Sequence, residues 1–264
     1  MKVTIDLNRS VEENASYYFD KAKKHKKKRD GAMSAVEDAK KKLEKISQKH
    51  KKESIKDLES QQEQQILIDR KKQWYEKFRW FRTSDGLLCI GGRDATTNEI
   101  VIKKHTDAKD LVFHTDMAGS PFFVIKSEGE EISQQSIREA ADATATFSKA
   151  WKLGISNTPV FYVKPEQVTK EAKSGEFLPK GAFMIRGKTY YTDNLINLAV
   201  GVTEDHAVMA GPVSAVKAHC KAFCEVIQGT LKASEAAKKI QKKIGLADLD
   251  EIIRALPAGT YRIK

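Results

Sequence analysis

The sequence predicts an α+β protein, with an α-helical coiled-coil hairpin over residues 1–77 and a mixed α/β domain with C-terminal helices over residues 78–264. Two observations support this division. The first 77 residues contain one glycine and no proline, a composition that favours long helices. After Trp80 the pattern changes to short alternating runs bounded by Gly, Asp and Asn, which is typical of strands.

The first segment is helical and strongly basic. Ser10 and Glu13 form a capping-box pattern, so a helix is expected to begin near Val11 and to run to about Lys49. Small and apolar residues recur at spacings of three and four, the seam of a coiled coil. Ser54 and Asp57 repeat the capping pattern, and a turn near residues 50–54 followed by a second helix to about Lys77 would bury this seam. One unbroken helix is the alternative, because no Pro or Gly enforces the turn.

In the second segment, strands are expected over Leu87–Gly92 and Glu99–His105, on either side of a loop. An amphipathic helix is expected from Ser133 to about Leu153, ended by Gly154, and another helix is expected to begin at Pro212. Further strands are expected in DLVFHTD, PFFVIKS, TPVFYVKP, GAFMIRGKTYY, LINLAVGV and HAVMAG.

The charge of the chain predicts a polyanionic partner. The net charge is +11, and nucleic-acid backbones or acidic lipid surfaces are the polyanions that such a field attracts. Between Lys21 and Lys77 there are 19 Lys or Arg against 10 Asp or Glu, so the helical arm carries most of the excess. No apolar run is long enough for a membrane span and the N-terminus lacks a signal-peptide pattern, so a cytoplasmic protein is expected.

Cysteine usage predicts neither disulfides nor a metal site. Three cysteines fit a reducing compartment. Cys220 and Cys224 stand four apart near His219 but lack a second ligand pair, so they are expected to be buried side chains on one helix face. No cofactor is predicted.

A long stretch resembles the RNA-binding domain of the NFACT family. It reads KKQWYEKFRWFRTSDGLLCIGGRDATTNEIVIKKHTDAKDLVFHTDMAGSPFFVIKSEGE, and the similarity continues through GPVSAVKAHC to DEIIRALPAGTYRIK. This family contains the ribosome-associated quality-control tailing factors, including fibronectin-binding-A-like proteins and Caliban. The sequence resembles archaeal members and begins where the family's N-terminal domain would end. A part cut at a domain boundary is expected, and a natural short form is the alternative.

The resemblance implies a function and partners. It implies a non-enzymatic RNA-binding module that binds tRNA and large-subunit ribosomal RNA, on a 50S-type subunit that holds a stalled peptidyl-tRNA. Peptide-bond formation would belong to the ribosome. The arm could also pair with a coiled-coil protein partner or form a homodimer.

Candidate RNA contacts are basic residues near aromatics, at strand ends or on the arm. Arg93 follows a glycine pair and could reach a phosphate, or could instead form an internal pair with Asp94. Gly91 and Gly92 are not expected to form a phosphate loop, because no helix is predicted after them. The full set of predicted contacts is Arg93, His114, Lys126, Lys149, Arg186, Lys188, Lys24, Lys27, Lys28 and Arg29.

Two alternatives remain open at this point. Asp110, His114 and Asp116 alternate along one strand and could project together, which would suit a nucleic-acid-processing enzyme that uses His114 and Asp116. A structural or RNA-contacting role for His114, with an aspartate orienting its ring, fits the same pattern. A coiled-coil protein-interaction scaffold, with the basic charge as solvated surface, is the other alternative.

Overall fold

The computed structural model describes residues 3–171 and 178–264, without the α1 side chains at 51–57, 59–64 and 69. By internal contacts the chain divides into two units, Met1–Gln65 and Ile66–Lys264. No helix in the described part of the chain is long and apolar enough to cross a membrane. The predicted α+β class is confirmed.

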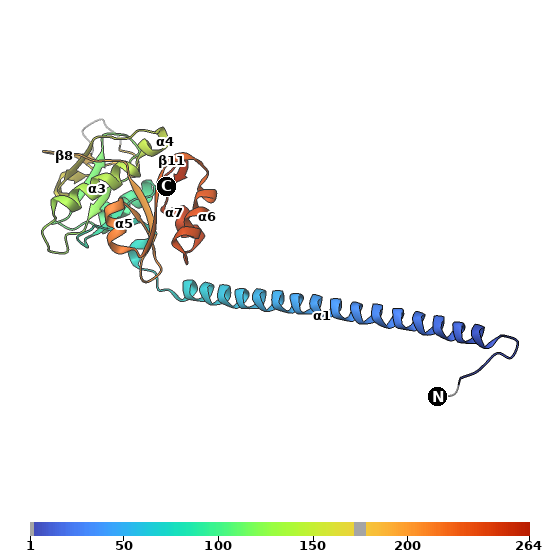
Figure 1. Ribbon diagram of the computed structural model, residues 1–264. Helices are drawn as coiled ribbons and strands as arrows, with labels where there is room; N and C mark the ends of the chain where they lie inside the picture. The colour runs from blue at the N-terminus through green and yellow to red at the C-terminus, as the bar shows by residue number, and fades with distance from the viewer. Residues whose placement is uncertain (1–2, 172–177) are drawn as a thin grey trace. The chain divides into compact units, whose positions relative to one another are not determined.

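The first unit is dominated by one long helix, α1 (Val11–Asp69), drawn as an unbroken spiral in Figure 1. The predicted capping box is present. Ser10 Oγ accepts a hydrogen bond from Glu13 N at 3.2 Å, and Glu13 Oε2 accepts one from Ser10 N at 2.8 Å. The prediction of a turn at residues 50–54 is wrong, because α1 continues through it in the absence of any helix-breaking residue.

Antiparallel sheets form the second unit. Strand order is β1-β2-β4-β3-β5-β8 in the six-stranded sheet and β10-β9-β11-β12 in the four-stranded sheet, while β6 pairs with β7. The strands are β1 (Arg79–Arg82), β2 (Leu88–Gly91), β3 (Leu111–Thr115), β4 (Phe123–Ile125), β5 (Val160–Val163), β6 (Val168–Thr169), β7 (Met184–Ile185), β8 (Tyr190–Thr192), β9 (Leu198–Val202), β10 (Val208–Gly211), β11 (Ala222–Leu231) and β12 (Tyr261–Ile263).

Short helices cover these sheets. Helix α3 packs on β3 and β4, while α6 and α7 lie together against the smaller sheet, in red in Figure 1. The helical elements are η1 (Trp74–Lys77), α2 (Ala95–Lys104), α3 (Gln134–Thr146), α4 (Lys149–Leu153), η2 (Pro165–Gln167), α5 (Val213–His219), α6 (Ala233–Ile244) and α7 (Leu249–Ala255).

The strand predicted over Glu99–His105 is wrong, because this segment belongs to helix α2. Asp94 caps the helix by accepting a hydrogen bond from Thr97 N at 2.8 Å, and Thr97 Oγ1 accepts one from Asp94 N at 2.9 Å. This reciprocal cap outweighs the β-branched composition of the helix. A helix therefore does follow the glycine pair.

Two predicted helices are shorter than expected. The helix from Ser133 is divided at Ser148, whose Oγ accepts a hydrogen bond from Ala150 N at 3.1 Å and so starts α4; the predicted end at Gly154 is confirmed, with φ of 70°. The helix predicted from Pro212 ends at His219, and the next segment is strand β11. Cys220 and Cys224 are buried, as expected, but not on one helix.

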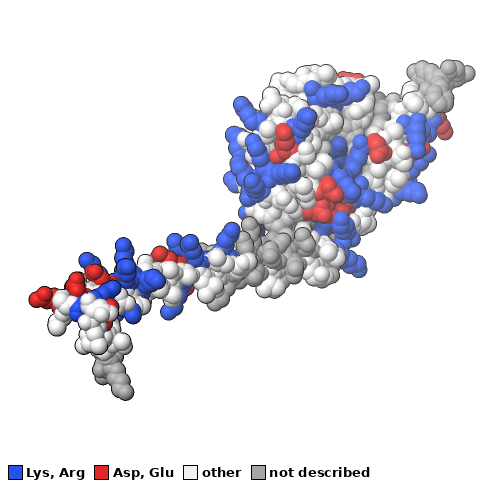
Figure 2. Space-filling model, turned by 90° about the vertical axis from the view of Figure 1, so that its right-hand side faces the viewer, with Lys and Arg blue, Asp and Glu red and all other residues white. Residues whose placement is uncertain are grey.

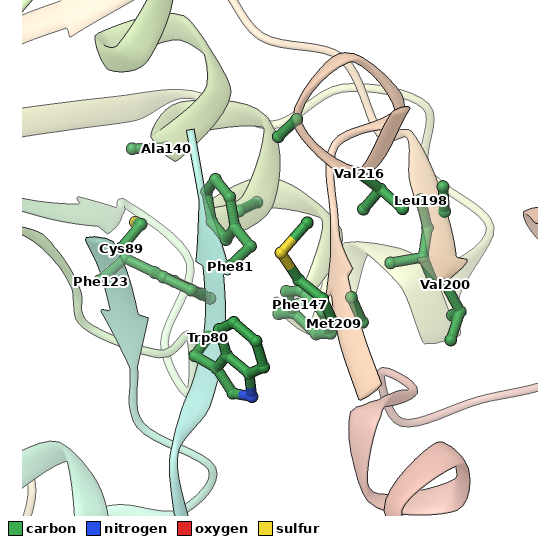
Figure 3. Packing of buried hydrophobic residues seen from close by; sticks show 14 of the residues in the cluster. Trp80, Phe81, Cys89, Phe123, Ala140, Phe147, Leu198, Val200, Met209 and Val216 are labelled. Atoms are coloured by element: carbon green, nitrogen blue, oxygen red, sulfur yellow. The ribbon is translucent and has the colours of Figure 1, made fainter. Parts of the chain in front are cut away.

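One core joins the two larger sheets. Phe81 from β1 lies between Phe123 from β4 and Met209 from β10, as Figure 3 shows. At Gly211 a Cβ atom would come 2.8 Å from Phe81 Cγ, so only glycine allows this approach of β10 to β1. This packing fixes β1 relative to β10, and it therefore also positions Arg79, the first residue of β1.

A buried carboxylate lies beside this core. Asp142 on α3 accepts hydrogen bonds from Leu195 N at 2.8 Å and from Asn197 Nδ2 at 2.7 Å. Asp142 is 9% exposed. Burial raises its pKa to about 6, and this effect is larger than the opposite effect of the two hydrogen bonds, which lower the pKa.

We predict that Asp142 makes folding stability depend on pH between about 4 and 6. Its folded pKa lies above the ordinary value of 3.8, so the folded state binds a proton that the unfolded state does not. As pH falls from 7 to 4.5, the wild type should gain about 2 kcal/mol relative to Asp142→Asn. Denaturant unfolding of both proteins at each pH measures this, and parallel profiles would contradict it.

Candidate nucleic-acid interface

The predicted arm residues are solvent-exposed. Lys24, Lys27, Lys28 and Arg29 lie on α1, and Figure 2 shows Lys and Arg side chains gathered along this helix. Arg29 pairs with the neighbouring Asp30 at 2.8 Å, while the three lysines form no ion pair with any described residue. These ammonium groups are therefore available to an anionic surface.

A second exposed basic region lies at the edge of the six-stranded sheet. We call Arg186, Lys188, Tyr190 and Tyr191 the edge strip, because β8 is the terminal strand of that sheet. Tyr190 is 44% and Tyr191 59% exposed. The Lys188 ammonium lies 4.9 Å from the Tyr190 ring centroid. Cations beside exposed rings are the combination that binds single-stranded nucleic acid.

The edge strip is held by interactions from neighbouring segments. Gln167 Nε2 donates to the Arg186 carbonyl at 2.8 Å and to the Lys188 carbonyl at 2.9 Å, which fixes the turn between β7 and β8. The Tyr190 ring stacks on Tyr162 at 5.5 Å. Arg186 forms an exposed pair with Glu171 at 3.3 Å, a type of pair that contributes little and opens readily.

Lys126 is not available to RNA, contrary to the prediction. Its Nζ donates to the buried carboxylate of Asp110, to Asp107 at 2.6 Å and to the His105 carbonyl at 3.1 Å. The side chain is 10% exposed. Lys126 therefore neutralises a carboxylate inside the domain. Lys149, by contrast, is exposed at the start of α4.

The alternative in which Asp110, His114 and Asp116 act together has no support in the contacts of these side chains. Asp110 is occupied by the Lys126 pair, and Asp116 accepts a hydrogen bond from Tyr191 Oη at 3.1 Å. His114 Nε2 donates to the Ser120 carbonyl at 3.2 Å, so no aspartate orients the ring. The three side chains form no acid–base set.

His114 sits in a row of rings that crosses the sheet. Its ring stacks on Phe122 at 4.2 Å, and His114, Phe161 and Tyr191 are cross-strand neighbours on β3, β5 and β8. Burial lowers the pKa of His114, so the ring is neutral at pH 7. Any RNA contact it makes would be through hydrogen bonding or stacking.

The glycine pair before α2 does not form a phosphate loop, although a helix follows it. A Cβ atom at Gly92 would fall 1.9 Å from Asn98 Oδ1, so the space beside it is filled by a side chain. The Asp94 carboxylate already occupies the α2 N-terminus. The expectation that no helix follows the glycine pair is wrong, because α2 begins at Ala95.

Arg93 pairs with backbone carbonyls and not with Asp94. Its Nη2 donates to the Phe78 carbonyl at 2.9 Å and to the Glu76 carbonyl at 3.3 Å, and its Nε is buried without a partner. Carbonyls orient a guanidinium without neutralising it, so the positive charge of Arg93 remains.

Sequence reasoning missed two further arginines, Arg79 on β1 and Arg254 on α7. Together with Arg93 they line one cavity. The stretch FRWFR carried the one local signal, because a charged residue inside an apolar strand pattern is unusual. Within residues 3–171 and 178–264, no group of three or more His, Cys, Asp and Glu could hold a metal ion.

Comparison with known proteins identifies the second unit. Residues 77–187 match the family described as NFACT protein RNA binding domain. A Methanocaldococcus jannaschii protein described as archaeal Rqc2 homolog aRqcH is 40% identical over 203 residues, 74% of this chain and 30% of that protein. The family resemblance predicted from the sequence is confirmed.

More distant relatives agree. Human ribosome quality control complex subunit NEMF is 37% identical over 176 residues, 66% of this chain and 16% of that protein. The chain thus spans less than a third of the length of these relatives. A solved structure, the C-terminal part of the fibronectin/fibrinogen-binding protein from Streptococcus suis, aligns over 47% of each chain with 23% identity and a TM-score of 0.38.

We predict that Lys126 contributes to stability and not to RNA affinity. Lys126→Met should leave Asp110 charged and unpaired in the interior, which costs about 3–5 kcal/mol of unfolding free energy. Lys149→Met, at an exposed position, should change that free energy by less than about 0.5 kcal/mol. Urea unfolding compares the two variants, and equal losses would contradict the internal role of Lys126.

Proposed function

The chain carries an NFACT RNA-binding domain and is homologous to the Rqc2/NEMF ribosome quality-control factors, and from this premise we propose that it is a non-enzymatic RNA-binding module of such a factor. Its proposed ligands are tRNA and the large ribosomal subunit on complexes that hold a stalled nascent chain. It would act in the cytoplasm, where such complexes form. The observation that carries the proposal is the exposed positive charge on α1 and on the edge strip, where Lys24, Lys27, Lys28 and Lys188 form no ion pair with any described residue.

The two basic regions suit different parts of such a ligand. Lys24, Lys27 and Lys28 are close in sequence on one helix, and like charges three and four residues apart repel one another. An anionic surface relieves this repulsion, so the arm fits a region of dense phosphate such as ribosomal RNA. The edge strip adds rings, which can stack on unpaired bases such as those of tRNA loops and ends.

The enzyme alternative loses its geometric support. Neither aspartate is placed to exchange a proton with His114. Asp110 forms an ion pair with Lys126, and Asp116 accepts a hydrogen bond from Tyr191. Peptide-bond chemistry on a stalled complex would remain with the ribosome, and this chain would supply binding.

The scaffold alternative has one observation in its favour. Val36, Leu43 and Ile46 on the α1 seam are each more than half exposed. A second helix, from a partner protein or from another copy of the chain, would bury this seam. Sedimentation of the purified chain at increasing concentration distinguishes a homodimer from a monomer that awaits a different partner.

RNA binding should be strongly salt-dependent. If phosphates supply the contacts, the logarithm of the affinity should fall linearly with the logarithm of the salt concentration, with a slope of about −0.7 to −0.9 per phosphate neutralised. Filter binding of tRNA across salt concentrations measures the slope. Affinity that does not change with salt would remove the electrostatic basis of the proposal, and RNA cleavage during the assay would favour the enzyme.

The arm and the edge strip should prefer different ligands. Changing Lys24, Lys27 and Lys28 to Glu should weaken binding to large ribosomal subunits by more than tenfold, whereas Arg186→Ala with Lys188→Ala should weaken binding to isolated tRNA more than the arm change does. Changing Lys238, Lys239 and Lys242 on α6 to Glu is the charge-matched control. Cosedimentation and filter binding report the two affinities, and equal losses on both ligands would mean one continuous surface.

A further inference from the structure

A basic cavity of about 350 Å³ lies beside η1, β1, β10 and α7, apart from the arm and the edge strip. We call it the arginine cavity. Five cationic side chains line it, against two acidic ones. The cationic residues are Lys72, Lys77, Arg79, Arg93 and Arg254, and the acidic ones are Glu76 and Glu251.

Both carboxylates of the arginine cavity are already neutralised. Arg70 contacts Glu76 at 2.7 Å and Glu251 at 3.1 Å, with its side chain 6% exposed. Lys72 also pairs with Glu251, at 2.6 Å. Burial alone would lower the pKa of Arg70, but these two glutamates outweigh it and raise the pKa. The two carboxylates of the cavity wall, Glu76 and Glu251, therefore already form ion pairs with Arg70 and Lys72.

The three arginines of the cavity have no carboxylate partner among the described residues. Arg79 Nη1 donates to the Leu256 carbonyl at 3.2 Å, and its guanidinium lies 4.4 Å from the Phe147 ring centroid. Burial, followed by the charge of Arg93, lowers the pKa of Arg79 to about 10. The pKa of Arg93 is lowered by burial and then by Arg254, and the charges of Glu251 and Asp94 offset this only in part. The guanidiniums are thus close enough to repel one another.

Neighbouring guanidiniums without carboxylate partners cost folding free energy, so their presence indicates a role other than stabilising the fold. Desolvated like charges destabilise a protein, and the hydrogen bonds to carbonyls could be made by neutral side chains. The buried Nε of Arg93 has no partner, so one donor remains unsatisfied in a concave site. An anion in the cavity would remove both penalties.

The charge and the walls of the cavity favour a phosphomonoester. This group carries a charge of about −1.5 to −2 at pH 7, more than a carboxylate or a backbone phosphodiester, and it accepts several bonds from guanidiniums. Trp74, 46% exposed and stacked on His105 at 4.5 Å, supplies a ring at the same cavity on which a base could stack.

We propose that the arginine cavity binds the phosphomonoester of a nucleotide, at the end of an RNA strand or free, through Arg79, Arg93 and Arg254, with Trp74 beside the base. For the strand end, this inference rests on the proposed RNA-binding function. It adds a terminal-phosphate site to the backbone contacts made elsewhere.

The test compares ligands that differ only in the phosphate. Short single-stranded oligouridylate with a 5′-phosphate, with a 3′-phosphate and with neither is titrated into the full chain by calorimetry, as are uridine monophosphate and uridine. A terminal phosphate at one end should raise the affinity about tenfold or more, since a charge-assisted hydrogen bond contributes about 1.5–3 kcal/mol. Preference for the oligonucleotide over the mononucleotide assigns a strand end, and equal affinity assigns a free nucleotide; both support the site.

Variants separate this site from general attraction. Arg254→Gln should abolish the phosphate preference without unfolding the domain, because this exposed side chain makes no hydrogen bond within the described residues. Arg79→Met should do the same while keeping its packing on Phe147. Arg262→Gln, exposed on β12, removes the same charge elsewhere and should keep the preference.

Each failure has its own meaning. Equal affinity for phosphorylated and unphosphorylated strands, or a preference that Arg254→Gln leaves intact, would overturn the arginine-cavity proposal. If salt-sensitive tRNA binding persisted in that case, the proposed RNA-binding function would stand alone. Competition by a peptide with a free C-terminal carboxylate, but not by its amidated form or by uridine monophosphate, would assign the cavity to a protein end and also overturn the proposal.

Discussion

The ion pairs of Arg70 determine how charge is distributed in the second unit. Arg70 directly follows α1 and binds Glu76 in η1 and Glu251 on α7, which lie far apart in the sequence. A buried guanidinium is tolerated only with such partners. Because Arg70 pairs with both carboxylates and Lys72 also pairs with Glu251, the other arginines at the same place have no ion-pair partner among the described residues, although Glu251 and Asp94 partly offset the charge of Arg93. One structural contact thus decides that its surroundings are electropositive.

The positive charge of the protein is therefore of two physical kinds. On α1 and the edge strip it is solvated, so its attraction for phosphate acts at a distance and is screened by salt. In the arginine cavity the guanidiniums of Arg79 and Arg93 are partly desolvated and oriented by backbone carbonyls, so their interactions are short-ranged and depend on geometry. The first kind suits attachment to a large polyanion, and the second suits recognition of one chemical group.

The core explains why these charges can be held in place. Phe81 joins the two larger sheets through Met209 and Gly211, and Arg79 begins the same strand. Its guanidinium is then fixed by Phe147 and by the Leu256 carbonyl, at the end of α7. A substitution in the core would therefore displace the arginine cavity, whereas the solvated charges on α1 would be unaffected.

The sequence by itself determined the features that depend on local periodicity, composition and extended similarity. These were the basic N-terminal helix with its Ser10 cap, most strands, and the resemblance to the NFACT family. Only the tertiary structure decided which basic residues are free. Lys126 and Lys149 look alike in the sequence, but a buried carboxylate from a distant strand end binds the first, and nothing comparable engages the second in the described part of the chain. Ionic partnership is a long-range property, so local sequence cannot reveal it. For the same reason the arginine cavity appeared only when β1, α7 and the segment before α2 were brought together.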